Sequence, residues 1–292
     1  MAGAVTVTGG LSLLVYAVVT ASSHGWSSAT TIGLLGGAAA LLAAFVLIEA
    51  RSQAPLVPLS FFRNRTVAAA NVAGLLLGGL MFPMFVFLSL YMQQVLGYSP
   101  IRAGLAFLVI AVGIIASSGL AQGLVTRAGA KAVLVAGLLG FAVAQLLFLR
   151  VPAAGTYTAD LLPGFLIVAA ALGLAFVGDL IASAIGVRSA DAGLASGLIN
   201  TSQQIGGAVG LAVTTTVAAA RTTTLLHAGH PLASALTGGF HAVFAITGVL
   251  ALAGALVAVT LMRRSTGPAE PSLPVDLATV DQAASPGDID VS

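Results

Sequence analysis

Long stretches without any charged residue constrain this chain more than any other feature. Such runs include residues 66–101, 103–126, 132–149, 192–220 and 222–262. A helix needs roughly 20 consecutive apolar residues to cross the hydrocarbon core of a bilayer, and these runs reach or approach that length. The chain is 58% hydrophobic and 7% charged, well outside the composition of soluble domains. We therefore expect an integral membrane protein.

The hydrophobic pattern predicts an all-α membrane protein with about eight transmembrane helices. Their expected positions are residues 4–22, 31–49, 67–94, 103–124, 132–149, 162–187, 193–220 and 237–262. The segment 265–292 differs, because it holds five carboxylates, no Lys or Arg, and several prolines and glycines. We expect it to be a disordered acidic tail in the cytoplasm.

The positions of Lys and Arg predict the orientation in the membrane. Cytoplasmic loops carry an excess of these residues. With both termini inside, the cytoplasmic side collects Arg51, Arg63, Arg65, Arg127, Lys131, Arg188, Arg263 and Arg264, and the outer side collects Arg102, Arg150 and Arg221. The bias favours a multi-pass protein of the bacterial plasma membrane with cytoplasmic N- and C-termini.

One predicted helix carries amides and glycines where leucine would be expected. In GLASGLINTSQQIGGAVG at 193–210, helical spacing places one set on a common face: Gly193, Gly197, Asn200, Gln204 and Gly207. Gln203, Gly206 and Gly210 lie beside that face. Glycines spaced by four residues allow close helix packing, and amides in hydrocarbon bond another helix or water. For the glycines we favour packing; for Asn200, Gln203 and Gln204, packing and a substrate path stay equally open.

Three segments together resemble a known family. They are GLASGLINTSQQIGGAVG at 193–210, FLSLYMQQVLGYSPIRAGLAFL at 87–108 and PLVPLSFFRNRT at 55–66. In this order they resemble the fourteen-helix drug:proton antiporters of the major facilitator superfamily. The resemblance implies two linker transmembrane helices with a cytoplasmic loop at 1–65 and a C-terminal six-helix transporter bundle at 66–264. It also implies that the N-terminal bundle of such a transporter is missing.

A loop between two predicted spans resembles a second motif of that family. GLVTRAGAKAVL at 123–134 matches at Arg127, Gly129 and Lys131, but Thr126 stands where the family has an acidic residue. This difference argues against a charge-relay gate. It leaves a glycine turn with basic anchors, or a plain cytoplasmic loop.

Asp179 is the one acidic residue expected well inside a span. Glu49 and Asp160 fall at predicted helix ends, where water is near. A charged group near the bilayer centre costs roughly 2.5–3.5 kcal/mol on insertion scales, and such residues often serve proton or substrate pathways. Asp179 is therefore a candidate proton site. The alternative is a packed carboxyl that bonds a neighbouring helix.

Pro83 is expected to kink its helix, because it removes one backbone hydrogen bond and follows Gly78 and Gly79 by about one turn. The kink could serve gating or be static.

Three histidines could suggest a metal site. His227 and His230, expected in an external loop, and His241 have no carboxylate or thiol nearby in the sequence, so a solvated loop is favoured over a metal site. We find no sequence motif of an enzyme and none for a cofactor or nucleic acid.

Two function classes follow. In the first, the chain is part of a proton-coupled secondary transporter that exports small amphipathic molecules or drugs. Its partners are the lipid bilayer, a small-molecule substrate, protons, and an N-terminal half or further copies of itself. In the second, it is a non-transporting fragment or an accessory protein that associates with a full-length transporter. The polar face at 193–210 discriminates between them, because a stable chain needs something to cover it.

Overall fold

The computed structural model describes residues 2–52, 64–185, 187 and 191–262. In these ranges the regular structure is helical: α1 (Ala2–His24), α2 (Ala29–Arg51), α3 (Arg65–Leu90), α4 (Pro100–Ala106), α5 (Leu108–Ala128), α6 (Ala130–Phe148), α7 (Leu162–Ala184), α8 (Ala192–His227) and α9 (Leu232–Leu261). π-helical turns extend α3 over Tyr91–Val95 and precede α7 over Tyr157–Leu161. The expected tail at 265–292 and the loop at 53–63 lie outside the described residues.

Polar side chains define where several of these helices begin. Ser28 accepts a hydrogen bond from the backbone N–H of Thr31 at 3.1 Å, and Asn64 accepts one from Thr66 at 3.0 Å. Such caps satisfy backbone donors that lack a partner inside the helix. The apolar sequence then continues each helix across the membrane thickness.

Within the described residues, seven helices are long and apolar enough to span a membrane. A shorter apolar stretch, Gly3–Val18, lies within α1. The all-α membrane fold is therefore confirmed. Several predicted ends need correction. The span expected at 103–124 is divided at Phe107 into α4 and α5, and α8 continues to His227, which the sequence had placed in a loop.

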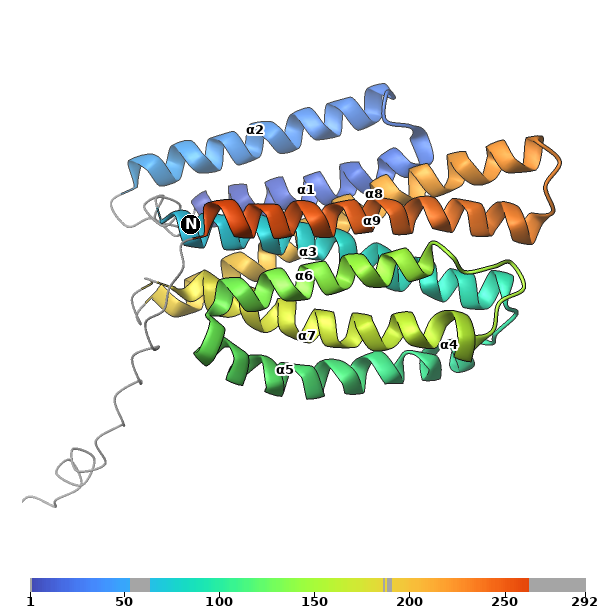
Figure 1. Cartoon of the computed structure of the whole chain (residues 1–292). Coiled ribbons are helices and arrows are strands. Elements are labelled where there is room, and N and C mark those ends of the chain that lie inside the picture. The colour runs from blue at the N-terminus through green and yellow to red at the C-terminus, as the bar shows by residue number, and fades with distance from the viewer. Residues whose placement is uncertain (1, 53–63, 186, 188–190, 263–292) are drawn as a thin grey trace, which may run out of the picture.

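The helices form an elongated bundle in which α2 lies at one edge and α5 at the opposite edge (Figure 1). α1 packs against α2 and α8, whereas α3, α6, α7 and α9 provide most of the interior. The largest fully buried side chains in this interior are Tyr91, Phe141, Phe148, Phe165 and Phe244.

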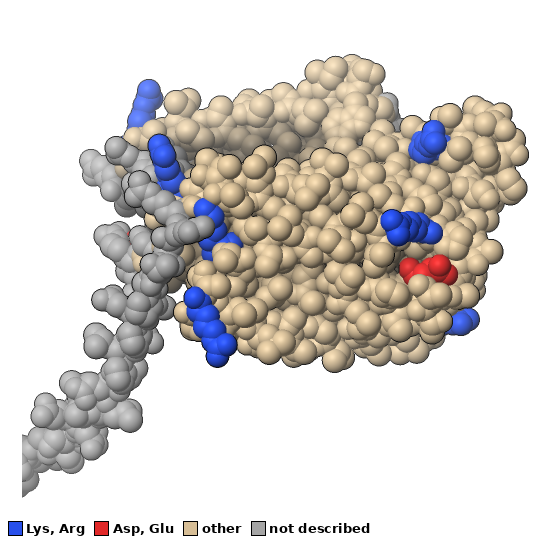
Figure 2. Space-filling model, in the orientation of Figure 1, with Lys and Arg blue, Asp and Glu red and all other residues tan. Residues whose placement is uncertain are grey.

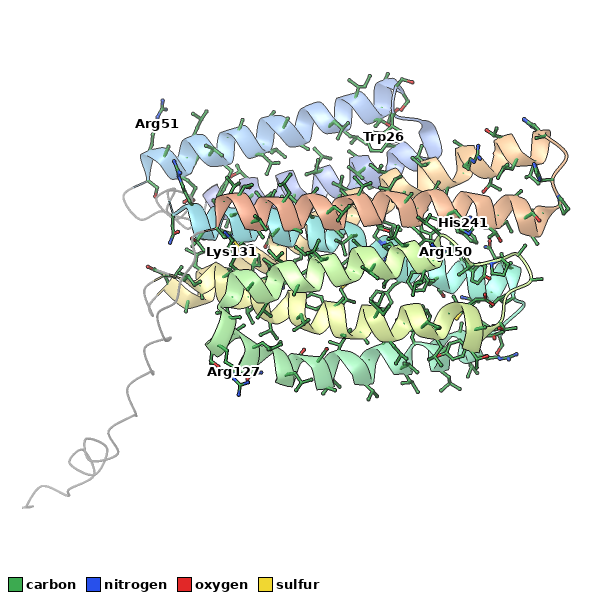
Figure 3. All side chains as sticks on the ribbon, viewed as in Figure 1. Trp26, Arg51, Arg127, Lys131, Arg150 and His241 are labelled. Carbon is green, nitrogen blue, oxygen red and sulfur yellow. The ribbon has the colours of Figure 1, made fainter. Side chains whose placement is uncertain are left out.

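Charged side chains on the face shown in Figure 2 gather at the two ends of the bundle, with an uncharged surface between them. Arg51, Arg127 and Lys131 lie at one end, and Arg150 lies toward the other (Figure 3). This separation matches the two groups of basic residues expected from the sequence. Which end faces the cytoplasm stays a prediction, and Arg63, Arg188, Arg263 and Arg264 lie outside the described residues.

α3 and α8 approach each other so closely that their backbones touch. A Cβ atom added to Gly78 would collide with the carbonyl oxygen of Gln203, and one added to Gly206 would collide with that of Leu75. A Cβ on Gly210 would likewise meet the backbone of Gly79. Glycines at these positions therefore allow a contact that no larger residue could enter.

This contact predicts opposite outcomes for two substitutions on the same helix. Gly210→Leu should reduce the yield of monodisperse protein in detergent severalfold, because its side chain has no room beside Gly79. Gly197→Leu is the matched control, since, apart from the adjoining turns of its own helix, no described atom lies within 4 Å of a Cβ built there. Size-exclusion profiles of the two variants would provide the comparison. A normal profile for Gly210→Leu would contradict the packing.

Candidate functional site

A buried carboxyl group lies where α3, α7 and α8 meet. The Asp179 side chain on α7 is 0% exposed. Gln203 on α8 donates a hydrogen bond from Nε2 to Asp179 Oδ2 at 3.2 Å. On the α3 side, Gly74 leaves room for the carboxyl, because an added Cβ would lie 2.9 Å from Oδ2. Three helices therefore enclose this one acidic group.

Among the described residues, the second carboxyl oxygen of Asp179 has no hydrogen-bond partner. Oδ1 is buried, and the described residues supply it with no donor. A buried polar atom without a partner costs roughly 1–3 kcal/mol, so such atoms often mark a function or a bound small species. A proton on Oδ1 would convert this oxygen from an acceptor into a donor and remove the charge.

A second polar link joins α3 to α8 next to the carboxyl. Ser202 donates from Oγ to Asn71 Oδ1 at 3.0 Å, and Asn71 donates from Nδ2 to the carbonyl oxygen of Val67 at 2.9 Å. Sequence reasoning did not single out Asn71. Its position could have been noticed, because Asn71, Gly74 and Gly78 share one helical face through spacings of three and four residues.

The three amides expected to act together on α8 point in different directions. Gln203 is partly buried against Asp179, whereas Asn200 and Gln204 are exposed on the surface of the described chain. The buried side of the helix instead carries Ala195, Ile199, Gly206 and Gly210. Helical spacing placed Asn200 and Gln204 on one face with glycines. The angle around the helix axis does not show which face of the helix contacts the bundle.

The glycines and the proline also differ in their surroundings. Gly206 and Gly210 pack on α3, whereas Gly193 and Gly197 have open space around them among the described residues. The expected packing role of Gly193 and Gly197 therefore stays a prediction. Pro83 is buried in α3, and the helix continues through it to Leu90. The expected kink at Pro83 stays a prediction.

The loop with Arg127, Gly129 and Lys131 forms a one-residue turn between α5 and α6. Gly129 has a φ of 83°, a conformation that glycine adopts without strain. Lys131 donates from Nζ to the carbonyl oxygens of Val259 at 2.7 Å and Met262 at 2.8 Å. Its ammonium group therefore caps the C-terminal end of α9, where a cation is favourable. Arg127 is exposed at the same end (Figure 3).

For the histidines, the sequence favoured a solvated loop over a metal site. In the described part of the chain, no three histidine, cysteine or acidic residues gather into a group that could hold a metal ion. His241, labelled in Figure 3, forms a hydrogen bond in which its Nε2 atom is 2.9 Å from the carbonyl oxygen of Val151. This contact joins α9 to the segment that follows α6.

Comparison with known proteins gives a family match over most of the chain. A sequence profile of the Major Facilitator Superfamily matches residues 1–211. A cephamycin export protein of Amycolatopsis lactamdurans is 41% identical over 224 residues, which cover 74% of this chain and 45% of that protein. A puromycin resistance protein of Streptomyces alboniger is 33% identical over 267 residues, covering 88% of this chain and 52% of the relative.

A third relative also matches most of this chain over about half of its own length. A lincomycin resistance protein of Streptomyces lincolnensis is 35% identical over 212 residues, which cover 72% of this chain and 44% of that protein. The chain therefore spans about half the length of the relatives it matches.

The geometry around Asp179 predicts that neighbouring glutamines differ in their contribution to stability. Gln203→Leu should lower the thermal stability in detergent, because it removes the donor at Oδ2 and leaves a buried carboxyl without that partner. The expected loss is about 1 kcal/mol, within the range for polar contacts between membrane helices. Gln204→Leu, on the exposed side, should leave the melting temperature unchanged or higher. Equal losses in the two variants would exclude the contact.

Proposed function

The chain belongs to the Major Facilitator Superfamily, and on this premise we propose that it forms part of a proton-coupled secondary transporter. The exported molecules would be small amphipathic compounds or drugs. The names of the three relatives concern export of, or resistance to, antibiotics, which supports this substrate class. The proposed role is transport and includes no catalytic step.

One observation carries the proposal: α8 exposes amides in the middle of an apolar helix. Asn200 and Gln204 point away from the described bundle, next to a buried polar junction. An amide that faces hydrocarbon without a partner is unfavourable, whereas a water-filled path or a second bundle satisfies it. Secondary transporters of this class place their binding site between two halves near the membrane midplane.

We assign separate roles to the two parts of the chain. In the proposal, residues 1–65 are linker helices and residues 66–264 form the C-terminal bundle. The packing of α1 on α8 supports a fixed link between them. Trp26, in the turn between α1 and α2, adds a contact to α8 by donating from Nε1 to Thr216 Oγ1 at 3.3 Å. Both termini would lie in the cytoplasm.

Asp179 is the proposed proton site. It is buried among three helices, one of its oxygens has no partner among the described residues, and its second oxygen accepts a hydrogen bond from α8. Proton gain and loss there would change a contact between α7 and α8. Such a change would shift the population between two arrangements of these helices, which is what a residue that couples proton movement to transport must do.

The function can be tested by producing the chain together with the N-terminal portion of a relative. The chain would be produced in cells that lack efflux pumps, together with the N-terminal portion of the Amycolatopsis relative that precedes its matched region. Extrusion of a fluorescent cationic dye would be followed with and without an uncoupler. We expect uncoupler-sensitive extrusion from the pair and none from the chain alone.

The relative divided at the same point, with its own two halves produced together, is the positive control. If the divided relative extrudes the dye and the pair with this chain does not, the transport proposal fails and a non-transporting fragment or accessory protein is favoured. Extrusion by the chain alone would indicate that copies of this chain assemble a transport path without a second half.

The same assay tests the proton site. Asp179→Asn should abolish uncoupler-sensitive extrusion and leave membrane insertion unchanged, because the amide keeps the size of the side chain but cannot exchange the proton. Asp160→Asn is the matched control. Asp160 precedes the same helix and accepts a hydrogen bond from the Thr156 backbone at 2.6 Å, a role that an amide oxygen can also fill. Unchanged extrusion by Asp179→Asn would remove this residue from the mechanism.

A further inference from the structure

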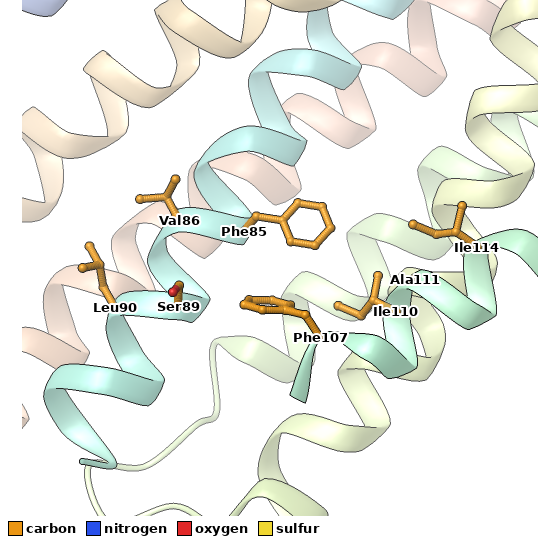
Figure 4. Close-up of a pocket in the computed structure, with 8 residues that line it drawn as sticks. All are labelled: Phe85, Val86, Ser89, Leu90, Phe107, Ile110, Ala111 and Ile114. Carbon is orange, nitrogen blue, oxygen red and sulfur yellow. The ribbon is translucent and has the colours of Figure 1, made fainter. Parts of the chain in front are cut away.

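A pocket of about 580 Å³ lies between α3 and α5. α3 contributes Phe85, Val86, Ser89 and Leu90, and the α4–α5 segment contributes Phe107, Ile110, Ala111 and Ile114 (Figure 4). Both α3 and α5 pack against α7, so α7 keeps them at a fixed separation. The volume lies within the range of sites that hold drug-sized molecules.

Two aromatic rings line this pocket, and one of them is held in place by α7. Phe85 and Phe107 face each other across the two helices, with ring centroids 5.5 Å apart (Figure 4). Phe107 stacks on Phe165 of α7, with an angle of 7° between the rings. Tyr157 packs edge-on against Phe165 and donates from its hydroxyl to the carbonyl oxygen of Ala106 at 3.0 Å. These contacts fix the Phe107 ring at the break between α4 and α5.

The lining of the pocket carries no charge. Ser89 supplies its one side-chain hydroxyl, and Ser89 Oγ accepts a hydrogen bond from Gln93 Nε2 at 2.8 Å. No Asp, Glu, Lys or Arg is among the lining residues. A cationic or anionic group would therefore find no partner here, whereas an uncharged ring would find apolar surface and aromatic neighbours.

Part of the pocket lining lies next to a residue of α3 that contacts α8. Phe82 on α3 lies against Gly207, because a Cβ added to that glycine would be 2.6 Å from the Phe82 ring. Val86 follows Phe82 by one helical turn and lines the pocket. Phe82 and Val86 are both 37% exposed, so this side of α3 is partly open both at its contact with α8 and at the pocket.

We propose that this pocket holds an uncharged, planar aromatic ring of the exported molecule, with Phe85 and Phe107 contacting its faces or edges. The inference rests on the proposed transport function and deepens it. This half of the transporter would then select for aromatic character and contribute nothing to recognition of charge. Any charged group of the same molecule would extend toward the α8 amides or the second half.

Binding can be measured on this chain without transport. The sequence contains no cysteine, so Ser89→Cys creates a single thiol in the pocket. We expect N-phenyl-1-naphthylamine, an uncharged aromatic probe, to slow its reaction with N-ethylmaleimide about tenfold in lipid nanodiscs. Val249→Cys, at a 64% exposed position on α9, is the control and should react at the same rate with and without the probe. If both thiols respond equally, the probe acts through the membrane and the proposal fails.

The pocket could instead hold a lipid chain. In that case the Ser89→Cys thiol would react more slowly in nanodiscs than in detergent, and the aromatic probe would cause no further slowing. This result would overturn the proposal.

A filled pocket tests specificity in the paired transporter. Ala111→Trp places a ring in the space itself and should reduce export of a flat aromatic dye about tenfold, while export of a non-aromatic substrate changes less than about twofold. Ala116→Trp, on an exposed position of the same helix outside the pocket, should leave both unchanged. Equal loss of both substrates in Ala111→Trp would contradict an aromatic site. Absence of any export by the unmodified pair would count against the transport function, whereas thiol protection would still report on the pocket.

Discussion

The backbone contact between α3 and α8 is the constraint on which the rest of the site depends. Gly78 and Gly79 on one helix face Gly206 and Gly210 on the other, and no side chain separates them. Helices in a bilayer gain little from hydrophobic burial, because lipid tails are as apolar as leucine, so packing and hydrogen bonds determine their association. At this distance the short side chains of Asn71 and Ser202 can bond directly, and Gln203 reaches Asp179 on α7.

The same contact explains why two adjacent glutamines have different surroundings. Residues next to each other on a helix point about 100° apart, since one turn takes 3.6 residues. With Gly206 and Gly210 directed at α3, Gln203 turns toward α7 and Gln204 turns outward. The buried amide gives α7 and α8 a common polar contact, and the exposed amide remains for a substrate, water or a second bundle. The proposed transport function depends on this division.

The sequence predicted the helices well, because long uncharged runs leave few other structures in a membrane. It also predicted Gly129 as a turn, since a glycine between two spans is a strong local signal. It did not predict which face of α8 is buried, because glycines and amides occur on neighbouring faces and either could meet α3. Asn71 was missed for a related reason: its partner Ser202 is distant in the sequence, and only the packing register brings the two together. The aromatic pocket depends on two helices that share α7 as a support, which no local pattern records.

Cross-linking of α3 to α8 at the polar junction tests the account most directly. In the cysteine-free chain, Asn71→Cys combined with Ser202→Cys places two thiols where the native side chains are in hydrogen-bond contact. Dibromobimane becomes fluorescent when it bridges two nearby thiols, so the double variant in membranes should become fluorescent rapidly. Asn71→Cys combined with Asn200→Cys, whose second thiol lies on the exposed side of α8, should not. Equal fluorescence from both pairs, or none from the first, would contradict the register that places Gln203 on Asp179.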